Sequence, residues 1–147
     1  MVLHIIFKDM TPQEIIDINK LLAEFLGSEI EETLKGEKVY CLLLPDENDL
    51  SGFKKEFFTP DELKFHKDWK WLMNVVEEIE NLGMLFKVAR WREDEVLTNG
   101  YWCTISDSFS GVEFADSAYI DDTETRIEAM FLACAQFIEW YNQNKGG

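Results

Sequence analysis

The spacing of apolar residues predicts a first helix over residues 11–26. Apolar side chains recur there every three or four positions, which places them on one helical face. The stretch MTPQE marks the start, because Thr11 can cap the helix, Pro12 fits its first turn and Glu14 completes a capping box. Gly27 favours an end directly after this run.

A second apolar stripe predicts a helix within FHKDWKWLMNVVEEIENLG, residues 65–83. The preceding FTPDE repeats the capping pattern with Thr59, while Asp68 offers an alternative start after a bend. We expect Trp69 to lie in the core in either case. The apolar side is formed by Phe65, Trp69, Leu72, Met73, Val76 and Ile79, and is widened by Trp71, Val75 and Leu82.

After Gly83 the pattern changes and predicts three strands. The runs MLFKVARWR, VLTNGYWCTIS and VEFADSAYI are rich in apolar, aromatic and β-branched residues. Asn99–Gly100 predicts a hairpin turn, because a type I′ turn needs positive φ at two successive residues. SDSFSG predicts the turn into the third strand.

Acidic residues predict the start of a final helix at Asp121, Asp122 and Thr123, because negative side chains favour a helix N-terminus. Its apolar stripe comprises Ile127, Met130, Phe131, Cys134, Phe137, Ile138 and Tyr141. We expect this helix and the helix at 65–83 to lie side by side on the sheet. Trp71 and Trp140 occupy matching edges of the two helices and are expected near their contact.

Together these elements predict an α+β fold, in which helices pack on a small antiparallel sheet of about three strands, similar to an αβα sandwich. The length of 147 residues suits a single domain. We expect an N-terminal helix and an irregular segment in residues 1–59, and a helix, three strands and a helix in 60–147. Periodicity does not decide whether KVYCLLL, within 28–58, is a strand or a short buried helix.

Charge narrows the classes of function. The net charge is -15 at pH 7, which disfavours direct binding to nucleic acids and to anionic membranes, because both need Lys and Arg. A basic protein is the partner that this charge favours. We expect no membrane insertion, since no apolar run can span a bilayer. Three widely spaced cysteines without a secretion signal predict reduced thiols and a cytoplasmic protein.

Three clusters concentrate acidic charge: Glu29, Glu31 and Glu32; Glu93, Asp94 and Glu95; and Asp121, Asp122 and Glu124. We expect Glu93, Asp94, Glu95, Asp121 and Asp122 to form the partner-binding surface of a non-enzymatic interaction protein. The alternative reading, that the clusters are solvated loops and helix caps, stays open at this point.

Catalytic motifs are missing from the sequence. Nucleotide-binding, zinc-protease and nucleophile-elbow patterns do not occur, so no cofactor is predicted. The segment ENDLSGFKKEFF resembles a calcium loop, but it has Phe58 where the bidentate Glu should be, and no metal site is predicted. The alternative function is a small metal-free enzyme that uses His66 and Glu80, which requires the two side chains to meet in a cleft.

The segments FHKDWKWLMNVVEEIENLG and EAMFLACAQFIEWYNQN resemble the phage ABA sandwich domain, a group of small proteins encoded by phages and prophages of Bacteroides-like genomes. The resemblance covers roughly residues 60–145 and involves mostly core and capping positions. It implies helices packed on a small antiparallel sheet and a phage or mobile-element origin, which makes a host protein the expected partner. It implies no catalytic residues.

Overall fold

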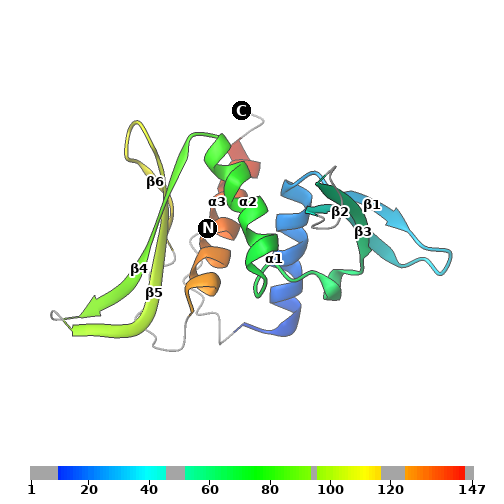
Figure 1. Cartoon of the computed structure of the whole chain (residues 1–147), viewed down its shortest axis with the longest axis horizontal. Helices are drawn as coiled ribbons and strands as arrows, with labels where there is room; N and C mark the ends of the chain where they lie inside the picture. Colours follow the sequence, from blue (N-terminus) through cyan, green and yellow to red (C-terminus); the bar gives the residue numbers. More distant parts are fainter. Residues whose placement is uncertain (1–9, 46–51, 94–95, 117–124, 145–147) are drawn as a thin grey trace.

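Three helices lie between two antiparallel sheets in the computed structural model of the chain, which describes residues 10–45, 52–93, 96–116 and 125–144 (Figure 1). One sheet has the strand order β1-β2-β3 and the other β4-β5-β6. The predicted α+β class is confirmed. The layer order differs from an αβα sandwich, because the helices are covered by a sheet on each side.

The predicted sheet after Gly83 is formed by β4 (Met84–Glu93), β5 (Val96–Asp107) and β6 (Glu113–Asp116). The predicted turn at Asn99–Gly100 is wrong, since β5 continues through it. The register passes from the pair Arg90↔Tyr101 to Arg92↔Leu97, so one residue of β4 faces three residues of β5. Asn99 and Gly100 therefore lie in a β-bulge of β5, which is another place where Gly is common.

The segment expected to be irregular forms the other sheet, from β1 (Glu29–Glu32), β2 (Lys38–Pro45) and β3 (Phe53–Phe58). KVYCLLL is therefore a strand. Its side chains alternate, with Tyr40 and Leu42 buried and Leu43 61% exposed. The resemblance to a calcium loop loses its basis here, because the second half of that segment is strand β3.

Helix α1 (Pro12–Phe25) begins as predicted: the Thr11 hydroxyl accepts from the Glu14 N–H, and the Glu14 carboxylate accepts from the Thr11 N–H. Helix α3 (Arg126–Asn144) begins later than predicted. Its first turn is closed by the equivalent box between Thr125 and Glu128. The expected start at residues 121–123 lies outside the described residues.

The second helix follows the alternative with a bend. A single 3-10 turn, η2 (Pro60–Glu62), is followed by an extended Leu63, and α2 (Trp69–Asn81) starts at its cap Asp68. The Phe65 N–H, which would bond within a continuous helix, instead donates to the Asn19 side chain of α1. A tertiary contact thus ends the helix that the sequence pattern predicts.

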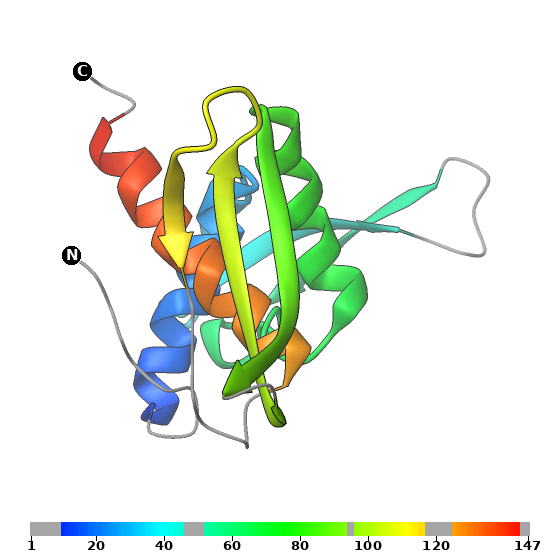
Figure 2. The ribbon, with the colours of Figure 1, turned by 90° about the vertical axis from the view of Figure 1, so that its left-hand side faces the viewer.

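Helix α3 is the centre of the molecule. Nine residues in its middle are buried, and they lie on all sides of the helix: Ala129–Ala135, Phe137 and Ile138. Figure 2 shows α2 and α3 behind the β4-β5-β6 sheet, with α1 farther back. The predicted core position of Trp69 is wrong, because Trp69 is 42% and Met73 39% exposed, whereas Trp71 is only 4% exposed.

The two tryptophans expected at one contact lie at different ends. Trp71 is in the first turn of α2, where its ring meets those of Phe58 and Phe65 edge-on, at centroid distances of 4.7 and 5.2 Å. Trp140 is near the end of α3, against Phe137. The helices run in the same direction, so their matching edges do not bring Trp71 and Trp140 together (Figure 1). In the described part of the chain, no helix is long and apolar enough to cross a bilayer.

Candidate functional site

The C-terminal ends of the three helices point to the same end of the molecule (Figure 1). A hollow of about 440 Å³ opens between them. It is lined by Glu24, Phe25, Glu78, Leu82, Tyr141 and Asn142. Each of the three helices therefore contributes to one surface depression through its last turn or the residue that follows.

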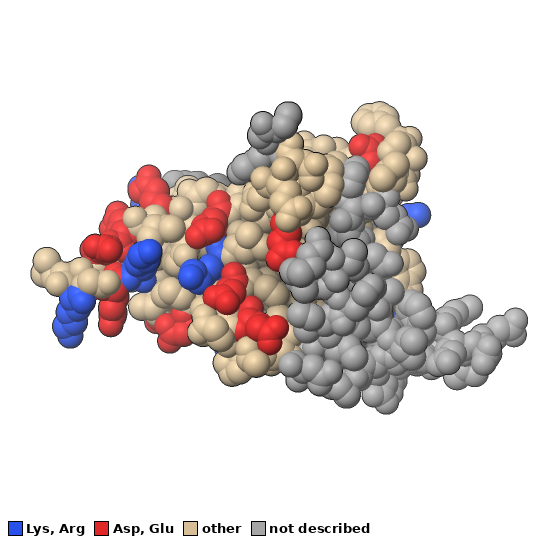
Figure 3. Space-filling view, turned by 180° about the vertical axis from the view of Figure 1, so that it is seen from behind, with Lys and Arg blue, Asp and Glu red and all other residues tan. Residues whose placement is uncertain are grey.

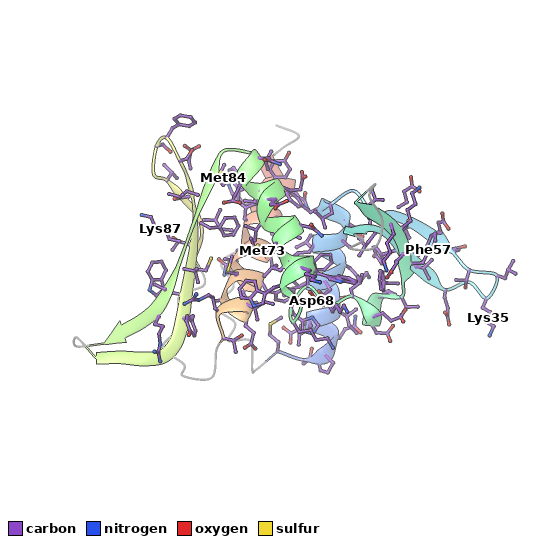
Figure 4. The ribbon with its side chains drawn as sticks, viewed as in Figure 1. Lys35, Phe57, Asp68, Met73, Met84 and Lys87 are labelled. Atoms are coloured by element: carbon purple, nitrogen blue, oxygen red, sulfur yellow. The ribbon has the colours of Figure 1, made fainter. Side chains whose placement is uncertain are left out.

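One wall of this hollow is aromatic. The Phe25 and Tyr141 rings meet edge-on with centroids 5.9 Å apart, and Tyr141 also stacks on Phe137 at 6.0 Å. An adjoining depression of about 250 Å³ is lined by Leu82, Met84, Phe137, Trp140, Tyr141 and Asn144. The hollow thus continues into a mostly apolar surface, beside Met84 at the start of β4 (Figure 4).

On its other side the hollow continues into a groove of about 370 Å³ between the end of α1, strands β1 and β2, and helix α2. Glu29, Glu77 and Glu78 line it, and Glu78 belongs to both depressions. Lys55 is the one basic residue among the described residues that line the two. We call Glu24, Glu29, Glu77 and Glu78 the acidic track.

A contact with β2 positions one end of the track. Glu24 accepts a hydrogen bond of 3.4 Å from the hydroxyl of Tyr40, which is buried on β2. Burial, and then the negative charge of Glu24, raise the pKa of Tyr40 and keep this hydroxyl a donor. Beside Glu29, the buried Ser28 Oγ has no hydrogen-bond partner among the described residues.

The backbone adds negative potential to the same end. Aligned peptide dipoles place about half a negative charge at the C-terminus of a helix. No basic residue lies in the last turn of α1, α2 or α3 to offset it. Carboxylates and helix termini therefore act together, and the arrangement favours cationic groups.

The back of the molecule has a different charge pattern. Figure 3 shows acidic and basic side chains mixed over the β1-β2-β3 end, where they form no surface of one sign. A salt bridge of 2.6 Å between Lys54 and Glu56 belongs to this end. The net charge alone thus does not locate a site, whereas the hollows do.

Four of the five partner residues predicted from the sequence lie outside the described residues: Asp94, Glu95, Asp121 and Asp122. Glu93 is the last residue of β4 and pairs with Val96, at the end of the β4-β5 hairpin. Sequence reasoning missed Glu24, Glu77 and Glu78 as site residues. The signal was available in the helix ends, which carry acidic side chains where basic ones would be favourable.

The structure does not bring His66 and Glu80 together. Asp68 lies at the foot of α2 (Figure 4). His66 precedes it by two residues, whereas Glu80 is exposed in the last turn of the helix. Helix α2 has 13 residues, which at 1.5 Å per residue makes it about 20 Å long. The geometry required for a paired acid and base is therefore not met.

The cysteines and potential metal ligands offer no better reactive centre. Cys103 and Cys134 are fully buried, and burial raises the pKa of the Cys134 thiol well above its usual value, which disfavours the reactive thiolate. Within the described residues, no three His, Cys, Asp or Glu side chains are grouped so that they could hold a metal ion.

Comparison with known proteins gives no relative. No family model matches the chain, and no curated protein and no solved structure matches it.

Proposed function

We propose that the protein binds a basic partner protein through the acidic track. The observation that carries the proposal is the meeting of Glu24, Glu29, Glu77 and Glu78, from three separate segments, across two connected depressions. All four side chains are exposed, and their summed field along the two depressions steers cationic groups towards them.

The surroundings of the track suit a segment with both basic and apolar side chains. Lysine or arginine side chains would lie along the carboxylates, and an apolar side chain would occupy the depression next to Leu82, Phe137 and Trp140. The aromatic wall at Phe25 and Tyr141 can also hold a cation over or beside a ring. A metal ion would use the carboxylates alone, whereas a protein segment would also use the aromatic wall and the apolar depression. The combination therefore favours a protein partner.

The resemblance described above supports a more specific setting. We propose that the partner is a basic host protein, that the chain comes from a phage or mobile element, and that both act in the cytoplasm. The partner-binding role of Glu93, Asp94, Glu95, Asp121 and Asp122 remains part of this proposal as a second acidic surface.

Affinity capture from a bacterial lysate tests the proposal when two charge-matched variants are compared. One variant carries Glu24→Gln, Glu77→Gln and Glu78→Gln. The control carries three changes at exposed acidic positions away from the track, Asp17→Asn, Glu37→Gln and Asp61→Asn. Both variants lose the same charge, so their general electrostatic attraction for basic proteins is equal.

We expect the track variant to lose a partner that the wild type and the control retain. Association with that partner should slow about tenfold or more between low and physiological salt, because the Debye length falls to about 8 Å. Equal losses in both variants would show that only net charge matters. Failure to retain any partner at any salt concentration would remove the proposal.

A further inference from the structure

Among the residues that the structure describes, strand β1 forms an open edge of its sheet. It lies at the end of the order β1-β2-β3, and all four of its residues are exposed. The strand is part of a hairpin whose tip is marked by Lys35 (Figure 4). An uncovered strand edge presents backbone donors and acceptors to any extended segment that can pair with them.

The register shows which backbone groups are free. The Thr33 N–H donates to the Glu37 C=O at 2.8 Å, which makes this a hydrogen-bonded pair. Such pairs alternate in an antiparallel ladder, so Glu31↔Val39 and Glu29↔Cys41 are also hydrogen-bonded pairs. The N–H and C=O groups of Ile30 and Glu32 consequently point away from β2.

The side chains of β1 give the edge a chemical preference. Glu29 and Glu31 lie on one face, opposite Cys41 and Val39, neither of which offsets a negative charge. Ile30, which is 47% exposed, lies on the other face together with Glu32, and Glu32 is opposite Lys38. An added strand with basic residues on one face and apolar residues on the other complements both faces.

The opposite edge of the same sheet has the opposite preference. Strand β3 carries Lys54, Lys55 and Glu56, and because Lys54 forms a salt bridge of 2.6 Å with Glu56, the charge of Lys55 remains and gives this strand a net charge of about +1. Glu29 also lines the groove that contains Glu77 and Glu78. A basic chain that follows the acidic track thus arrives at β1 rather than at β3.

We infer that the partner contributes an extended segment with alternating basic and apolar residues, which pairs with the open edge of β1 as an additional antiparallel strand. Its backbone bonds to Ile30 and Glu32, and its basic side chains face Glu29 and Glu31. The inference rests on the proposed function and adds the conformation and the docking position of the partner.

The test uses the full ¹⁵N-labelled chain and the synthetic peptide acetyl-KVKVKVK-amide. The matched control is the same peptide with N-methyl groups on alternate residues, which keeps the charge and removes backbone donors. Hydrogen exchange is followed at the amides of β1. We expect the first peptide to slow exchange at Ile30 and Glu32 by about tenfold or more. The amides of Glu29 and Glu31, already bonded to β2, should change little.

Variants of Ile30 test the edge from the protein side. Ile30→Pro removes the outward donor but no bond to β2, and proline is tolerated at such edge positions. We expect peptide affinity to fall at least about fivefold, the equivalent of one lost hydrogen bond, and to fall less in Ile30→Ala. Protection of the Glu29 and Glu31 amides shows whether the hairpin of the proline variant is intact. If it is not, the N-methylated peptide decides.

The outcomes separate this inference from the proposed function. If the peptide binds, depends on Glu24, Glu77 and Glu78, and leaves Ile30 and Glu32 unprotected, strand addition is overturned and the acidic track stands. If the peptide does not bind the wild-type chain, strand addition and the acidic track both fail. Protection of Ile30 and Glu32 that rises with protein concentration, without peptide, would assign the edge to a second copy of the chain and overturn the inference.

Discussion

Asn19 holds His66 in its neutral form. The Asn19 Oδ1 accepts from the backbone N–H of Phe65 at 2.9 Å, so its amide nitrogen faces the His66 Nδ1, 3.0 Å away. The amide nitrogen can only donate, and the Nδ1 must therefore accept and carry no proton. Asn19 is only 1% exposed, and this contact links helix α1 to the loop that leads into α2.

Stability should consequently fall in mild acid. Burial, and then the charge of Lys67, lower the pKa of His66 below its ordinary value of 6.5. The unfolded chain binds the proton more readily, so the contribution of His66 is complete above pH 6.5 and is lost as the pH falls through the lowered pKa. Urea unfolding between pH 8 and pH 5 measures this. The matched variant His66→Gln should lose the difference, and an unchanged difference would contradict the assignment.

Replacing Asn19 by aspartate should reverse the shift at His66. The carboxylate can still accept from Phe65, but it places a negative oxygen where the amide donor was, which favours a protonated Nδ1. We expect the pKa of His66 to rise above its wild-type value, as followed by NMR titration of the ring. Asn19→Leu should instead cost about 1–3 kcal/mol, since the Phe65 N–H loses its acceptor. A lowered pKa in the aspartate variant would refute the hydrogen-bond geometry.

The two neighbouring tryptophans should differ sharply in their contribution to stability. Trp71→Ala removes a buried ring that contacts Phe58 and Phe65, and should cost about 3–5 kcal/mol. Trp69→Ala, at a position 42% exposed, should cost about 1 kcal/mol or less. Chemical denaturation of the two variants gives the comparison. Equal costs would mean that α2 presents a different face to the core.

The two similar capping sequences should also contribute unequally. Thr11→Ala removes the cap of the 14-residue helix α1 and should destabilise the protein by about 1 kcal/mol. Thr59→Ala affects only the three-residue turn η2 and should cost less. Thermal unfolding of both variants provides the measurement, and a larger effect at Thr59 would show that the turn contributes more than its length implies.

The sequence predicts those elements whose signals are local. The cap of α1, the β4 and β6 strands and the apolar stripe of α3 follow from spacing and from single turns. The helix after Thr59 does not, because the bond from the Phe65 N–H to Asn19 joins residues far apart in the chain. Trp69 and Trp71 fit the same wide apolar side, and only the rings of Phe58 and Phe65 decide which one is buried.

The candidate site is less predictable than the fold for a related reason. Glu24, Glu29 and Glu78 are separated in the sequence and form one track only because α1 and α2 end together beside β1. The sequence instead draws attention to runs such as Glu93–Glu95, where charge is concentrated locally. Counting charges along the sequence cannot show that carboxylates from separate segments lie close together in the folded chain.

The central position of α3 has a consequence for biosynthesis. The ribosome makes this helix after both sheets and the other two helices, yet its buried side chains pack against α1, α2 and the β4-β5-β6 sheet. Until residues 126–144 leave the exit tunnel, the apolar faces of α1, α2 and β5 have no cover. Folding of this chain is therefore expected to finish only after translation of the helix, and the nascent chain before that point is a natural substrate for chaperones.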